Sequence, residues 1–149
     1  MERDDLRRRL DTVESAYEYM LAFAAQGLPA ESSGREGGRI RGELDALAAS
    51  LDGLQASFER FVAAEAIAAR AQHQDFQRVL ADDAGKALAA VRLVLAQPGI
   101  SSQLVDNLNA SLHVRALLTD VFLLDEILKV LGSSIPAARG GAALDPQQS

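Results

Sequence analysis

The chain lacks cysteine and tryptophan altogether, and aromatic residues make up only 5% of its 149 residues. Without cysteine there can be no disulfide framework, no thiolate-bound zinc, no thiolate-held iron–sulfur cluster and no cysteine nucleophile. The shortage of aromatic side chains removes most of the stacking platforms on which single-stranded nucleic acids bind. Several classes of site and ligand are therefore excluded from the start.

Basic residues are outnumbered by acidic ones. The formal net charge is −6 and the isoelectric point is about 4.9, whereas a protein that neutralises a nucleic-acid backbone carries the opposite sign. We therefore expect no nucleic-acid partner. Lys86 and Lys129 are the only lysines, and all other basic residues are arginines. This bias is typical of a GC-rich bacterial genome.

Long apolar runs are also missing, since a membrane-spanning helix needs ~18–20 consecutive apolar residues. The most apolar stretch, 116–131, is interrupted by Asp120, Asp125, Glu126 and Lys129. The chain opens on acidic residues with no apolar segment behind them, unlike a secretory signal peptide. The sequence thus predicts no membrane span, and a cytoplasmic location is the expectation.

Clusters of β-branched residues typical of strands are absent, and the good helix formers Ala, Leu, Arg, Glu and Gln dominate instead. With 48% apolar residues, a chain of this length suffices for one core and not for two. We predict a single all-α domain over residues 1–132, an antiparallel bundle of about four helices. A disordered tail over 133–149, containing Gly and Pro, is expected to follow.

Helices are expected over residues 4–26, 38–72, 75–96 and 101–131. In the first, apolar residues follow the alternating spacing of four and three that is typical of a coiled-coil or bundle seam. A flexible linker over 28–38, rich in Gly and Ser, follows that helix.

The limits of the two middle helices stay open, because residues 40–95 contain no proline and keep an apolar stripe roughly in phase. One helix of ~56 residues would be ~84 Å long, which exceeds the size of a compact chain of this length. Either two copies share one very long central helix, or the segment folds back. We favour a fold-back within 70–85, with 82–85 as the strongest break signal and 72–75 as the second. The second helix then ends between 72 and 81, and the third begins between 75 and 84.

The last expected helix carries apolar residues on every side in its second half. A helix that is apolar all round must be surrounded, whereas each helix of a four-helix monomer normally keeps one solvent-exposed face. We assign Leu112 and Phe122 to the core and expect a homodimer or a larger homo-oligomer through this helix. The interface candidates are Leu117, Leu123, Leu124, Ile127 and Leu131, with Tyr19 and Phe23 from the first helix.

Glu65 is an acidic residue within the apolar stripe of the second helix. A carboxylate in such a position must be paired, hydrogen-bonded or protonated. Three interpretations stay open. The helix ends there and leaves Glu65 in water, or Glu65 pairs with an arginine, for which Arg115 is the natural candidate. In the third, Glu65 lines a ligand pocket with Gln72 and His73.

No catalytic or metal-binding arrangement is recognisable in the sequence. Neither His73 nor His113 follows a Glu by three positions, as the carboxylate-bridged di-iron bundles require. No P-loop, nucleophile elbow or zinc-binding histidine pair occurs. Asp106, Asn109, His113 and Asp120 share one column of the last helix, which we interpret as a solvated stripe. We predict no metal and no cofactor.

Together these observations predict a non-enzymatic, cytoplasmic protein–protein interaction module, such as an adaptor, chaperone or regulatory subunit, that acts as a helical homo-oligomer. The surplus of apolar helix surface and the lack of a catalytic arrangement support this hypothesis. The alternative is a helical bundle that binds a small ligand or cofactor in a pocket near Glu65, with or without enzymatic activity.

Overall fold

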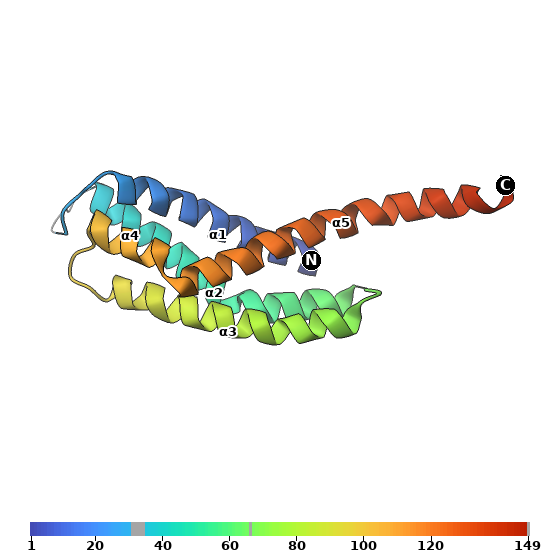
Figure 1. Ribbon diagram of the computed structural model, residues 1–149, viewed down its shortest axis with the longest axis horizontal. Coiled ribbons are helices and arrows are strands. Elements are labelled where there is room, and N and C mark those ends of the chain that lie inside the picture. The colour runs from blue at the N-terminus through green and yellow to red at the C-terminus, as the bar shows by residue number, and fades with distance from the viewer. Residues whose placement is uncertain (31–34, 66, 149) are drawn as a thin grey trace.

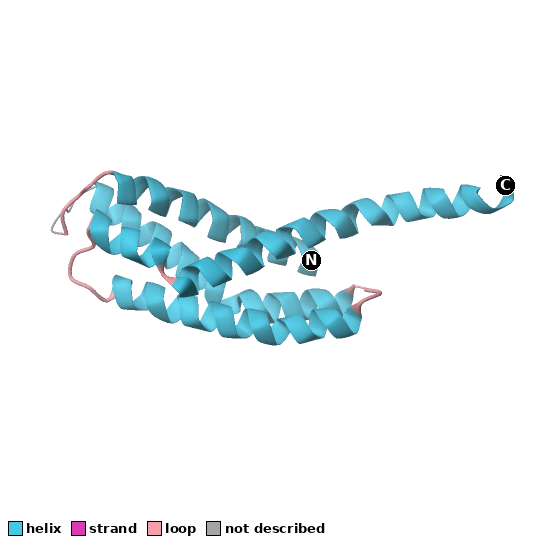
Figure 2. Cartoon of the chain, in the orientation of Figure 1, coloured by secondary structure: helices cyan, strands magenta, loops and turns pink. Residues whose placement is uncertain are grey.

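Helices account for nearly all of the chain in the computed structural model (Figure 1). The structure describes residues 1–30, 35–65 and 67–148, and it describes side chains over 1–30, 37–65 and 67–132. The helices are α1 (Glu2–Ala25), α2 (Arg35–Ala64), α3 (Arg70–Leu95), α4 (Ser102–Ala110) and α5 (Leu112–Gln148). Within the described ranges there is no strand (Figure 2), which confirms the predicted all-α class.

The first three helices run antiparallel to one another, α1 against α2 and α2 against α3 (Figure 1). The remaining two helices pack on different partners. α4 packs mainly on α1, and α5 packs mainly on α3. Toward its C-terminal end α5 extends past the other helices (Figure 1).

The connection from α1 to α2 follows the sequence signals at its start. Gly27 has a φ of +67°, the left-handed conformation that glycine adopts readily after the end of a helix. α2 begins at Arg35, inside the expected linker over 28–38. Residues 31–34 of that linker lie outside the described part of the chain.

The turn between α2 and α3 lies earlier than the predicted fold-back within 70–85. α2 ends at Ala64 and α3 begins at Arg70, and neither predicted break, 72–75 or 82–85, interrupts α3. The Arg70 guanidinium donates hydrogen bonds to the carbonyl oxygens of Val62 and Glu65 and so closes the turn. Every residue type has a backbone carbonyl. The amino-acid composition of the alanine-rich turn therefore does not reveal that Arg70 closes it.

Ser111 splits the predicted helix 101–131 into α4 and α5. Its backbone is extended (φ −65°, ψ 145°), and its Oγ accepts a hydrogen bond from the backbone N–H of Val114 at 3.3 Å. Such a side chain caps the start of a helix. The break changes the helical phase, so the assignment of Leu112 and Phe122 to the core is wrong: they are 75% and 52% exposed.

α5 is helical as far as Gln148, whereas the sequence predicts a disordered tail over 133–149. Side chains beyond Gly132 lie outside those that the structure describes. The disordered tail and the domain limit at residue 132 therefore stay predictions.

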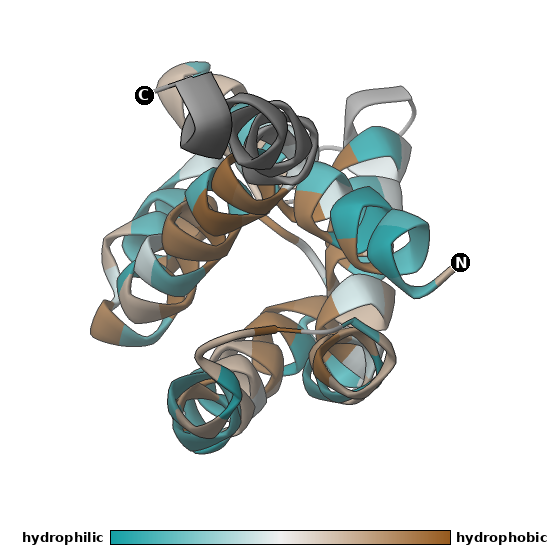
Figure 3. Cartoon of the chain, turned by 90° about the vertical axis from the view of Figure 1, so that its right-hand side faces the viewer, coloured by the Kyte–Doolittle hydropathy of each residue, from teal (hydrophilic) through white to brown (hydrophobic). Residues whose placement is uncertain are grey.

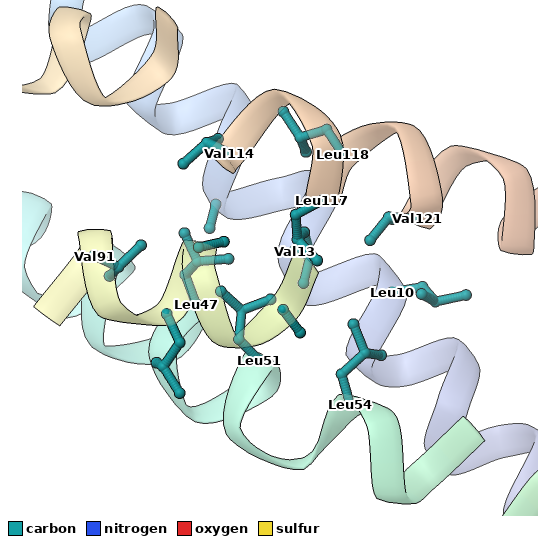
Figure 4. Close-up of a cluster of buried hydrophobic side chains, with 14 of the residues drawn as sticks. Leu10, Val13, Leu47, Leu51, Leu54, Val91, Val114, Leu117, Leu118 and Val121 are labelled. Carbon is teal, nitrogen blue, oxygen red and sulfur yellow. The ribbon is translucent and has the colours of Figure 1, made fainter. Parts of the chain in front are cut away.

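The core contains apolar side chains from all five helices, and those of α1, α2, α3 and α5 point toward one another in Figure 4. Leu10 on α1 and Leu54 on α2 have no exposed surface. A gap among these side chains measures about 10 Å³, which is room for about one water and not for an organic ligand. Hydrophobic segments of the helices face one another, and α1 is hydrophilic near its N-terminus (Figure 3).

We predict that Leu54→Ala lowers the free energy of unfolding by about 2–5 kcal/mol, because it leaves a cavity in a closely packed core. The measurement is urea denaturation followed by circular dichroism. Leu21→Ala is the control, since Leu21 is 47% exposed and its truncation should change stability by no more than about 0.5 kcal/mol. Equal losses in the two variants would contradict the core described above.

Candidate interaction surface on α5

Glu65 lies in the turn after α2, where its Oε1 accepts a hydrogen bond from Nη2 of Arg3 at 3.1 Å. The Glu65 side chain is 31% exposed, and the Arg3 guanidinium lies 5.7 Å from the centroid of the Phe61 ring. α2 ends just before Glu65, as the first interpretation expects, but the side chain is not left in water. It pairs with an arginine, as the second interpretation expects. The partner is Arg3 instead of the expected Arg115, since the first turn of α1 lies beside the end of α2.

The other residues of the predicted pocket have separate surroundings. Gln72 is exposed on α3, and Arg115 is exposed on α5. Nδ1 of His73 lies 2.8 Å from the carbonyl oxygen of Ala69, and the ring stacks on Phe58 with 6.3 Å between centroids. These contacts give His73 a packing role, and they do not favour a ligand pocket shared with Glu65.

Three of the interface candidates lie inside a single copy of the chain. Phe23, Leu117 and Leu124 keep at most 2% of their surface exposed. Phe23 helps to close the core where α1 ends, and the two leucines lie on the inner face of α5. An interface between copies therefore has to be formed by other side chains.

The remaining candidates keep accessible surface. Tyr19, Ile127 and Leu131 are half-buried, and the Tyr19 ring lies 4.5 Å from the guanidinium carbon of Arg39. Leu123 is 48% exposed, which makes it the most accessible candidate named from the sequence.

The outward face of α5 carries a row of positions that includes Leu123. Its large apolar members, Leu112, Leu123 and Val130, are 75%, 48% and 56% exposed. The row follows the spacing of four and three that keeps side chains on one helix face, and the buried residues of α5 lie on the opposite face. We call it the outer row, and its members are Leu112, Ala116, Thr119, Leu123, Glu126 and Val130.

The outer row is not apparent from the sequence when 101–131 is taken as one helix. In a continuous helix Leu112 continues the apolar face of Leu104 and Leu108. Once Ser111 interrupts the helix, Leu112 belongs instead to the solvent-exposed side of α5. The capping property of Ser111 was the available signal.

A carboxyl pair lies where α5 packs on α3. Asp120 is 6% exposed, and a second acid, Asp83, lies next to it. Burial, together with the closeness and the charge of Asp83, raises the pKa of Asp120 to about 8. The interpretation of Asp120 as part of a solvated stripe is therefore wrong, because the break at Ser111 separates it from the exposed Asp106.

A second acidic contact lies where α5 packs on α1. Asp125 lies 3.9 Å from Arg7 and 3.9 Å from Lys129. Glu14 on α1 is half-buried, and its Oε2 has no hydrogen-bond partner among the described residues. Burial and the nearby charge of Asp125 raise the pKa of Glu14. α5 therefore meets carboxyl groups on both of its flanks.

A charge network joins the first turns of α1 to α2. Oδ2 of Asp5 accepts hydrogen bonds from the Ser57 hydroxyl at 2.6 Å, from Arg9 at 3.2 Å and from Arg60 at 3.3 Å. The Ser57 hydroxyl is the largest cause that lowers the pKa of Asp5 to about 2, and Arg9 adds to it while burial opposes it. This network fixes how α1 lies on α2.

Comparisons with known proteins gave no match to a protein family, to a curated protein or to a solved structure. Within the described ranges, no helix combines the length and hydropathy needed to cross a membrane. The function of the chain is therefore inferred from its own geometry.

We predict that Ser57→Ala raises the pKa of Asp5 from about 2 toward its ordinary value of 3.8, measured by NMR titration of the carboxyl carbon. A carboxyl with a lowered pKa stabilises the fold above its unfolded pKa and loses that contribution as the pH falls. The variant should therefore lose more stability at pH 7 than near pH 2. Ser50→Ala, a second buried serine of α2, should leave the pKa of Asp5 unchanged, and an equal shift there would contradict the assignment.

Proposed function

We propose that this chain is a cytoplasmic, non-enzymatic protein–protein interaction module that pairs with a second copy of itself through the outer row of α5. In this proposal α4 and α5 together form the fourth member of an antiparallel helical bundle. The observation that supports pairing is the exposure of three large apolar side chains on one face of α5, while the opposite face lies in the core. Covering apolar surface contributes roughly 25 cal/mol per Å².

The spacing of the outer row fits a second copy in the antiparallel direction. With the pairing centred between Thr119 and Leu123, Leu112 of one copy lies opposite Val130 of the other, and the arrangement is the same from both ends. A surface that matches itself in this way suits a twofold symmetric dimer. An alternating spacing of four and three is the one that two helices use to pack along a common seam.

The charges beside the row favour the same direction. Antiparallel pairing brings Arg115 of one copy close to Glu126 of the other, twice in each dimer. Parallel pairing would instead place each residue against its own equivalent, and like charges at such positions repel. The alternative of a ligand or cofactor site near Glu65 is less well supported, because Glu65 is already paired with Arg3.

We predict that Leu123→Glu weakens self-association about tenfold or more, because it places a charge in the apolar seam. Sedimentation equilibrium over a range of concentrations should give the wild type a mass near twice 15.9 kDa, and should move the variant toward the single chain. Leu21→Glu is the matched control, since Leu21 on α1 is 47% exposed against 48% for Leu123. A wild type that stays a single chain at every concentration would exclude the proposal.

The direction of pairing has a separate prediction. Arg115→Glu alone should weaken the dimer, because two acidic residues then face each other in each contact. Adding Glu126→Arg restores an opposite-charge contact and should recover most of the lost affinity, measured in the same sedimentation experiment. Each exposed pair contributes about 0.2–1 kcal/mol, so the two symmetric contacts together change the dissociation constant severalfold. If the double variant is weaker than Arg115→Glu alone, the pairing is not antiparallel.

A further inference from the structure

The contact between α3 and α5 contains the only buried aspartate of the described residues, Asp120. Its neighbour across the contact is a second acid, Asp83, and its Oδ2 lies buried without a hydrogen-bond partner among the described residues. An ionised carboxylate in such a place has lost its water and faces a like charge, so the charged form is strongly disfavoured. A proton between the two carboxyl groups removes the repulsion and supplies the donor that two carboxylates lack.

The charged groups on the neighbouring elements do not provide a cation in place of that proton. Lys86, on the same helix as Asp83, pairs with the exposed Asp82 at 3.1 Å. The charges of α1 that face α5, Arg7 and Glu14, lie next to Asp125 instead. The one charged residue of α4, Asp106, is exposed, as are His113 and Arg115 on α5.

A metal ion is also not indicated at this position. Among the described residues, no group of three His, Cys, Asp or Glu side chains is arranged to hold one. Two carboxyl groups alone fall short of the four to eight ligands that zinc, magnesium and calcium take. The ligand that this pair of acids fits is therefore a single proton.

We propose that Asp120 holds a proton against Asp83 when α5 is packed on α3, and that this packing weakens as the pH rises and the proton is held less often. The proposal goes beyond self-association, because it concerns the contact between two helices of one copy. When α5 separates, it exposes the inner apolar face that contains Leu117, Val121 and Leu124.

The break at Ser111 allows α5 to move while α4 stays in place. α4 is held on α1 at both of its ends. The Ser102 hydroxyl donates to the carbonyl oxygen of Phe23 at 2.6 Å, and the Asn109 amide donates to the carbonyl oxygen of Met20 at 3.3 Å. On its α3 side, α5 brings the buried Asp120 next to Asp83.

The direction of the pH effect follows from where the proton is bound. An aspartate in the unfolded or separated state loses its proton near pH 3.8, whereas the pKa of Asp120 in the packed state is about 8. Between these values the packed state binds the additional proton, so packing weakens as the pH rises through this window and levels off above it. One proton corresponds to at most about a tenfold change in the packing equilibrium per pH unit.

The test is hydrogen exchange with mass spectrometry on the full chain between pH 6 and 9, corrected for the intrinsic pH dependence of exchange. We expect the protection of amides in 114–131 to fall by up to about tenfold per pH unit until pH 8, with a smaller change in α2. Asp120→Asn should remove this dependence, because the amide donates to Asp83 without needing a proton. Asp82→Asn, which loses only the exposed pair with Lys86, should keep the wild-type dependence.

Two results would overturn the proposal: wild-type protection in α5 that is the same at pH 6 and pH 9, or an equal loss of pH dependence in Asp82→Asn. If Asp120→Asn does not fold by circular dichroism, Asp83→Asn replaces it, because it supplies a donor from the other side of the same contact. Repeating the measurement in Leu123→Glu separates this proposal from self-association. A proton site within one copy should keep its pH dependence there, whether or not the wild type forms dimers.

Discussion

The extended backbone of Ser111 sets the rotation of α5, and this rotation decides which side chains face the core. Had the helix continued through residue 111, Leu112 would share the buried face of Leu108. With the break, Val114 and Leu117 turn inward and Leu112 turns outward. The same rotation places Asp120 against α3 and Asp125 against α1, so both the outer row and the acidic contacts result from one backbone conformation.

The all-α class and much of the core followed from periodicity alone. Residues such as Leu10, Leu54 and Val91 lie on apolar stripes that the sequence shows directly, and all three are fully buried. Burial along a stripe is a repeated signal, since each turn of the helix adds another position in the same phase.

The turns were harder to locate, because single contacts between distant atoms determine them. Arg70 closes the turn after α2 by donating to backbone carbonyls, whereas Arg60 and Arg78 donate to carboxylates. Glu65 illustrates the same point, since the sequence left open whether the helix ends there or an arginine pairs with Glu65. The arginine that pairs with Glu65 is Arg3, because α1 packs beside α2. The partner of Asp120 was likewise invisible, because nothing in a single sequence aligns α3 with α5.

The carboxyl pair and the outer row lie on the same helix, so in our proposals they are thermodynamically linked. Self-association through the outer row needs α5 to be ordered, and its packing on α3 is what orders it. If pairing of two copies favours packed α5, it must also raise the affinity of Asp120 for its proton by the same factor. This reciprocity makes α5 a helix whose inner contact with its own chain and outer contact with a second copy respond to pH in the same direction.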